Sequence, residues 1–153
     1  MPTVELRFTA LPAHVRTARL VAVSLARRAG VADDLLDEVR LAVGEAATRA
    51  VSRHRTSCPA EPVLLRLTDT GDHFTAEVVD VARDPSPAAA PPALALATLA
   101  ETAEQAHPDA DLDESLPPGV DLAVIGGLVE DVQVAAGPGG CTVLMAWPTS
   151  AGR

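Results

Sequence analysis

The sequence of 153 residues contains no lysine, only two cysteines and no long apolar run. Cys58 and Cys141 are far apart and lack a CxxC spacing, which argues against a zinc site and a disulfide framework. No apolar run approaches the ~20 residues that cross a bilayer, and the N-terminus lacks the layout of a signal peptide. We therefore expect a cytoplasmic protein without a membrane segment.

Basic residues are also scarce. All twelve are arginine and face twenty-one acidic residues, which gives a net charge of −9. Residues 1–76 carry ten Arg and nine acidic residues, whereas residues 77–153 carry two Arg and twelve acidic ones. An acidic protein is repelled by a phosphate backbone, so nucleic acid is a poor candidate partner. The absence of lysine fits a GC-rich coding bias at least as well as a functional choice.

The remaining composition is that of an ordinary folded protein. The chain is 48% hydrophobic and 22% charged, and its length suits one domain. We expect a single domain over residues 1–147 and a frayed tail at 148–153. Three histidines, His54, His73 and His107, have no cysteine or carboxylate at ligand spacing, so the sequence predicts no metal site.

Hydropathy patterns in the first half predict a strand and two helices. Apolar and polar residues alternate over 4–11, the period of a half-buried strand. Helical spacing follows over 14–29, and Gly30 suits the left-handed position after a helix end. A longer helix is predicted over 32–54, where apolar residues recur at steps of three and four.

The second half adds a hairpin, an insert, a short helix and a further hairpin. The predicted strands are 63–67 and 74–80, then 132–136 and 141–147, with a helix over 121–129. Residues 84–118 are rich in Pro and Ala, then acidic, and form the predicted insert. This order indicates an α+β fold, a two-layer sandwich with helices on one face of a mixed, mostly antiparallel sheet.

Residues 38–50, EVRLAVGEAATRA, resemble the N-box helix of the histidine-kinase-like ATPases. The likeness is closest to their bacterial anti-sigma factors and serine-protein kinase switch proteins. In that family the helix carries a general-base Glu and, four residues later, an Asn that binds magnesium. The resemblance places Glu45 at the catalytic position and Arg49 where the Asn belongs.

The strand ending in Val78-Val79-Asp80 resembles the one whose Asp recognises the adenine amino group. The family continues this strand as D-x-G-x-G, but here Val81 and Ala82 follow Asp80 and both glycines are missing. Asp80 is thus the implied adenine contact. The alternative is that Asp80 serves as a turn residue at the strand end.

Two later segments complete the resemblance, which spans nearly the whole chain. Residues 119–125 resemble the G-x-G-L phosphate segment, with Gly119 and Leu122 in register and Asp121 in place of the second Gly. Thr142, in the closing hairpin, corresponds to a Thr near the adenine. The alternatives are that Asp121 caps the following helix and that Thr142 is an ordinary strand residue.

These substitutions change the chemistry that the resemblance implies. A guanidinium cannot ligate magnesium, and Asp121 adds a like charge where phosphate would bind. Residues 84–131 contain ten acidic residues and no basic one to pair with phosphates. The pocket is therefore interpreted as vestigial, with ATP or ADP left open as ligands and magnesium disfavoured. Arg49 has two alternative roles: a surface ion pair with Glu45, or direct contact with a nucleotide phosphate.

Three hypotheses follow. The first is a regulatory protein of the anti-sigma type, a pseudokinase rather than an enzyme, that forms a homodimer and binds a sigma factor, an anti-anti-sigma antagonist or both. Its acidic second half would suit a basic partner, although a solvated loop explains the acidity equally well. The second is an active serine-protein kinase that phosphorylates its antagonist with ATP. The third is a scaffold that needs no nucleotide.

Overall fold

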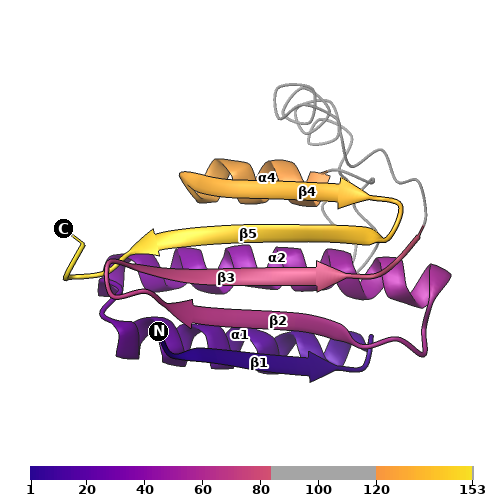
Figure 1. Ribbon diagram of the computed structural model, residues 1–153, viewed down its shortest axis with the longest axis horizontal. Helices are drawn as coiled ribbons and strands as arrows, with labels where there is room; N and C mark the ends of the chain where they lie inside the picture. Colours follow the sequence, from indigo (N-terminus) through magenta and orange to yellow (C-terminus); the bar gives the residue numbers. More distant parts are fainter. Residues whose placement is uncertain (84–119, 153) are drawn as a thin grey trace, which may run out of the picture.

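The computed structural model describes residues 1–83 and 120–152 (Figure 1). The predicted insert lies outside the described residues. The elements are, in chain order, β1 (Thr3–Phe8), α1 (Pro12–Ala29), α2 (Asp33–Ser57), β2 (Val63–Asp69), β3 (His73–Asp80), α4 (Val120–Leu128), β4 (Asp131–Gly137) and β5 (Gly140–Pro148).

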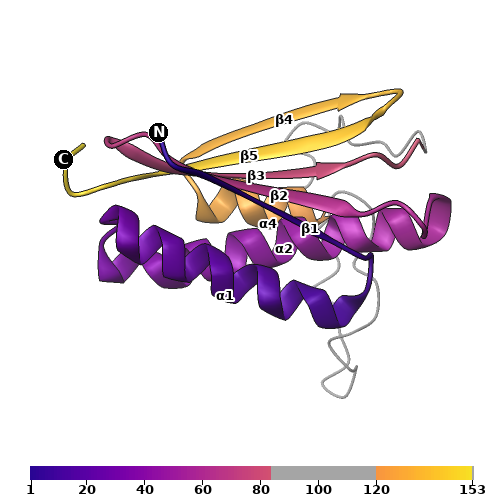
Figure 2. The same ribbon diagram turned by 60° about the horizontal axis from the view of Figure 1, so that its bottom comes forward.

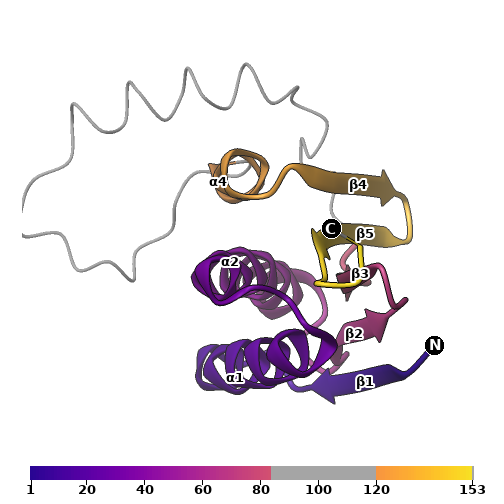
Figure 3. The ribbon, with the colours of Figure 1, turned by 90° about the vertical axis from the view of Figure 1, so that its left-hand side faces the viewer.

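The described strands form one sheet in the order β1-β2-β3-β5-β4, and every neighbouring pair is antiparallel. Figures 2 and 3 show all three labelled helices on one face of this sheet, with no described helix on the other face. The predicted α+β sandwich with helices on one face is therefore confirmed. The long helix α2 lies beside α1 and runs along β3, so residues from α2 meet the end of that strand.

The core lies between the sheet and the helices. Alternate residues of β2, β3 and β5 are buried, as expected for strands with one face covered. Their largest members are Trp147 and Phe74, whose ring centroids lie 6.3 Å apart. Trp147 Nε1 donates a hydrogen bond to the Glu38 carboxylate over 2.8 Å, which joins β5 to the first half of α2.

The first helix begins and ends for local reasons. Pro12 occupies its first turn, where the missing N–H costs nothing, and the helix begins at this proline. Gly30 ends it at φ 92°, the left-handed conformation that was expected of this residue.

The chain after β5 differs from the prediction of a frayed tail. Thr149 is fully buried, and its backbone N–H donates to the carbonyl of Asp72 over 3.0 Å. Its hydroxyl donates to the carbonyl of Gly71, and the N–H of Ser150 donates to the carbonyl of Gly30 over 2.9 Å. The prediction is wrong for these two residues because two neighbouring turns supply carbonyl acceptors. Within the described ranges, no helix has the length and apolarity needed to cross a membrane.

Candidate functional site

The carboxylate of Asp80 lies at the end of β3, where the strand leaves the sheet. Because residues of β3 alternate between faces, Asp80 shares the covered face with Val78 and is buried. Its Oδ1 accepts backbone N–H bonds from Ala82 over 3.2 Å and from Cys141 over 3.3 Å. A charged group in this position requires compensation by opposite charge.

Two arginines from α2 supply that compensation. Asp80 Oδ2 lies 3.1 Å from Arg53 Nε and 3.6 Å from Arg49 Nη1. The arginines are four residues apart and therefore share one side of the helix. Arg53 Nη2 also donates to the Ala82 carbonyl over 3.1 Å. Their side chains are 6% (Arg49) and 12% (Arg53) exposed, so one carboxylate holds two nearly buried cations.

The start of β5 completes the surroundings of Asp80. Gly140, at φ 130°, lies so close to the strand that a Cβ at this position would be 2.0 Å from the Asp80 carbonyl oxygen. Only glycine combines this backbone conformation with that close approach. The contact brings the Cys141 N–H within reach of the Asp80 carboxylate.

His54, the residue after Arg53, fixes the same region through both ring nitrogens. Nε2 lies 2.9 Å from the Val81 backbone nitrogen, which donates to it, so Nε2 carries no proton. Nδ1 therefore carries the ring proton and donates to the Glu61 carbonyl over 2.8 Å. The neutral, fully buried ring joins the end of α2 to the exit of β3 and to the loop before β2.

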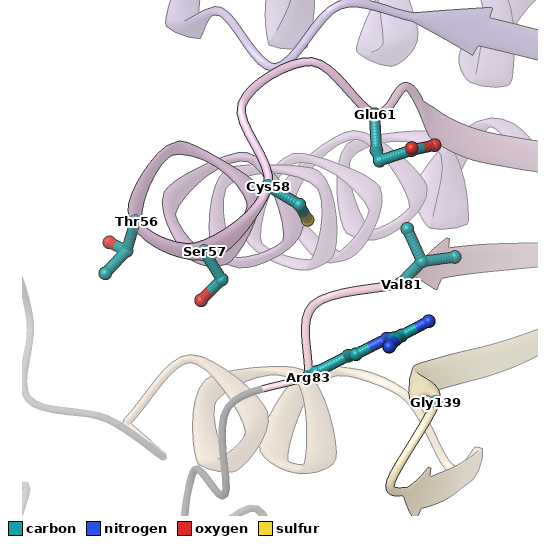
Figure 4. Close-up of a pocket in the computed structure, with 7 residues that line it drawn as sticks. All are labelled: Thr56, Ser57, Cys58, Glu61, Val81, Arg83 and Gly139. Carbon is teal, nitrogen blue, oxygen red and sulfur yellow. The ribbon is translucent and has the colours of Figure 1, made fainter.

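A cavity of about 810 Å³ opens beside this region (Figure 4). The described residues that line it are Thr56, Ser57, Cys58, Glu61, Val81, Arg83 and Gly139. Burial raises the pKa of the Cys58 thiol, and nearby Glu61 and Asp80 raise it further against the opposing effect of Arg53 and Arg83. The thiol thus stays protonated at neutral pH, which disfavours a role as a nucleophile.

The structure brings only part of the predicted site together. Arg49 and Asp80 form an ion pair, whereas Glu45 is half-buried and takes part in no ion pair with the described residues. The alternative of a surface Glu45–Arg49 pair is therefore wrong, because Arg49 is directed to the buried end of β3. The alternative of Asp80 as a turn residue agrees with its bond from the Ala82 N–H, two residues on, but does not account for the two arginines.

The remaining predicted site residues either lie away from Asp80 or fall outside the residues that the structure describes. Thr142 pairs with Val79, so its side chain lies on the uncovered face of the sheet, whereas Cys141 shares the face of Asp80. Gly119 lies outside the described residues, as do the side chains of Asp121 and Leu122. Helix α4 begins at Val120, which places Asp121 inside the first turn and not at the predicted cap position.

Sequence reasoning missed Arg53 and His54. A usable signal was present, since Arg53 follows Arg49 by one helical turn on a side of the helix that is otherwise rich in alanine. His54 was considered only as a metal ligand. Among the residues that the structure describes, no group of three potential ligands could hold a metal ion.

A family model described as "Histidine kinase-like ATPase domain" matches residues 8–147, and the chain belongs to this family. Its fold is similar to a crystal structure of the RsbU and RsbW domains of Rv1364c from Mycobacterium tuberculosis, at 15% identity and a TM-score of 0.63. The match covers 97% of this chain and 32% of that one, so the chain spans about a third of its length. No curated protein sequence matches. The predicted family resemblance is confirmed.

The family implies ATP with magnesium, and the residues around Asp80 do not fit that group. A carboxylate has about four acceptor positions, and Asp80 uses three of them for two backbone N–H groups and Arg53 Nε, while Arg49 Nη1 lies 3.6 Å from the same Oδ2. A purine amino group would therefore compete with two guanidinium groups for Oδ2. Arg49, at the position of the magnesium-binding Asn, offers donors and a positive charge where a cation needs oxygen ligands.

Proposed function

We propose that this chain is a regulatory protein of the anti-sigma type that binds protein partners and does not use magnesium-bound ATP. The partners would be a sigma factor, an anti-anti-sigma antagonist or both. The observation that carries this proposal is the buried carboxylate of Asp80, which forms ion pairs with both Arg49 and Arg53. If the Asp80 carboxylate is not free to bind adenine, the fold can still serve to bind protein partners.

Energetic arguments support the loss of the nucleotide. Freeing Asp80 for a ligand would break a buried ion cluster, which typically costs about 3–5 kcal/mol. A hydrogen bond gained from a purine amino group returns only about 0.5–1.5 kcal/mol. The exchange is unfavourable unless the rest of the nucleotide supplies the difference.

Several features favour a protein partner. The similar solved structure contains RsbU and RsbW domains by its title, and the match covers 97% of this chain and 32% of that one. The net charge of −9 would complement a basic surface on the partner. We further propose that the protein is cytoplasmic and forms a homodimer.

Calorimetry with ATP and ADP, each with and without magnesium, tests the loss of catalysis. We expect no magnesium-dependent heat up to millimolar nucleotide. Magnesium-dependent micromolar binding, followed by phosphorylation of an anti-anti-sigma protein that Glu45→Gln abolishes, would overturn the proposal and establish the kinase.

A second experiment tests the partner. Purified sigma factors and anti-anti-sigma proteins of the source organism are mixed with the chain, and complexes are weighed by size exclusion with light scattering. We expect a stable complex with at least one of them, formed equally well without nucleotide. If none of these proteins forms a complex, the anti-sigma assignment is wrong; the same measurement on the chain alone tests the homodimer.

A further inference from the structure

Among the described residues, the cluster at the end of β3 holds more positive than negative charge. Arg49 and Arg53 contribute two cations, Asp80 contributes one anion, and His54 is neutral by its hydrogen bonds. Glu45, one turn before Arg49, forms no ion pair with either arginine. An excess charge in a buried position is costly unless an opposite charge meets it.

The two guanidinium groups also have unused donors. Arg49 is 6% exposed, yet its contact with Asp80 is long, at 3.6 Å, and it donates no hydrogen bond to the described part of the chain. Arg53 Nη1 is buried, and none of those residues accepts a bond from it. Each guanidinium carries five N–H donors in a fixed fork, the arrangement that suits oxyanions.

We propose that Arg49 and Arg53 form a metal-independent site for a phosphate group, which they bind directly. This proposal deepens the proposed function, on which it rests, because it gives the site a ligand in place of magnesium-bound ATP. A tetrahedral phosphate presents several acceptor oxygens, so it can accept from two separate guanidinium groups while Asp80 remains between them. Its negative charge offsets the excess cation without any metal ion.

The neighbouring cavity indicates how large the ligand can be. Arg83, an exposed third arginine, lines that cavity, and Glu61 is the carboxylate that opposes it there. The cavity adjoins the cluster, since Val81 and Arg83 line it and the residue between them, Ala82, accepts a hydrogen bond from Arg53. About 810 Å³ would accommodate the organic part of a phosphate monoester.

The test titrates the full chain with inorganic phosphate, AMP and acetate in the presence of EDTA. Binding is followed by the arginine Nε–Hε signals in nitrogen-15 NMR spectra and by the melting temperature. We expect phosphate to shift the Arg49 and Arg53 signals and to raise the melting temperature, with acetate much weaker. Tighter AMP binding would identify a phosphate monoester as the ligand, and equal affinity would identify free phosphate.

The variants Arg49→Gln and Arg55→Gln form a matched pair on the same helix. Arg55 is exposed and outside the cluster, so its variant should respond like the wild type. Arg49→Gln keeps the closer Arg53–Asp80 pair and should bind phosphate about tenfold or more weakly. If that variant does not fold, Arg49→Lys, which keeps the charge but loses the fork, provides the comparison.

Two results would overturn the phosphate site. One is the absence of any shift at millimolar phosphate, and the other is an equal response of the Arg49 and Arg55 variants or an equal response to acetate. Neither result affects the proposed function, which fails separately if ATP binds only with magnesium.

Discussion

The two halves of α2 are buried against the same sheet by different means. The first half packs apolar residues, among them Leu36, Val39 and Val43, towards the end of the sheet that holds Trp147. The second half buries Arg49 and, further along, Arg53 and His54 at the opposite end (Figure 1). One helix therefore carries both an ordinary core and a buried polar cluster.

The difference shows where stability and function lie. Apolar burial is favourable at roughly 25 cal/mol per Å², so the first half needs no further explanation. A buried ion cluster is often no more stable than a well-packed apolar replacement. Stability alone therefore does not account for the buried charges in the second half of α2, whereas a role in binding would.

Removal of the central carboxylate should have the largest effect. Asp80→Ala leaves two nearly buried guanidinium groups without their counter-charge, and we expect a loss of about 3–5 kcal/mol in the free energy of unfolding. Urea unfolding measures it. Asp37→Ala, which removes an exposed pair with Arg40, is the control and should change stability by less than about 1 kcal/mol. A similar small loss in both variants would mean that the cluster is not desolvated in solution.

Loss of the buried histidine should have the next largest effect. His54→Ala removes hydrogen bonds to Val81 and Glu61 and leaves a cavity, for which we expect a loss of about 2–4 kcal/mol. Urea unfolding is again the measurement, with the neighbouring exposed Arg55→Ala as control. If the two variants are equally stable, the histidine does not join α2 to the exit of β3.

Sequence patterns predicted the elements that carry Asp80 and His54, but not the contacts that these two side chains make. The alternation of β2 and β3 and the three-and-four spacing of α2 predicted the sheet and the helix, because burial of one face imposes a period. The same periodicity shows that a residue faces inward but not what it meets there. Arg49 was compared with Glu45 on its own helix, whereas its actual partner, Asp80, comes from a strand thirty-one residues away.

The other errors have the same origin. Thr142 was placed in the site by resemblance alone, although a period of two puts adjacent strand residues on opposite faces. Thr149 was assigned to a frayed tail because nothing local holds it, and its acceptor in the Gly71–Asp72 turn is remote in sequence. Contacts across the fold, not local patterns, decided each of these positions.

A smaller loss of stability is expected for a polar contact in the first, apolar half of α2. Glu38→Ala removes the acceptor of the Trp147 indole N–H and should lower the free energy of unfolding by about 1–2 kcal/mol. Trp147 is the only tryptophan, so a shift of its fluorescence should accompany the loss. The adjacent exposed Asp37→Ala variant should leave the fluorescence unchanged, and a shift there too would assign the effect to the helix end as a whole.

The smallest expected effects are changes in the reactivity of the Cys58 thiol, which follows the second half of α2. Burial, with added contributions from Glu61 and Asp80, raises the pKa of Cys58, so its thiolate is scarce at neutral pH. Alkylation by iodoacetamide should therefore be slower than for a small free thiol and should accelerate as pH rises towards the elevated pKa. Cys141 is buried and should not compete for the reagent.

Two charge variants should change the rate of Cys58 alkylation in opposite directions. Glu61→Gln removes a group that raises the pKa and should speed alkylation severalfold, whereas Arg83→Gln removes one that lowers it and should slow the reaction. Salt should weaken both effects, because these side chains are exposed. Changes of the same sign in both variants would indicate altered access to the thiol instead of altered charge.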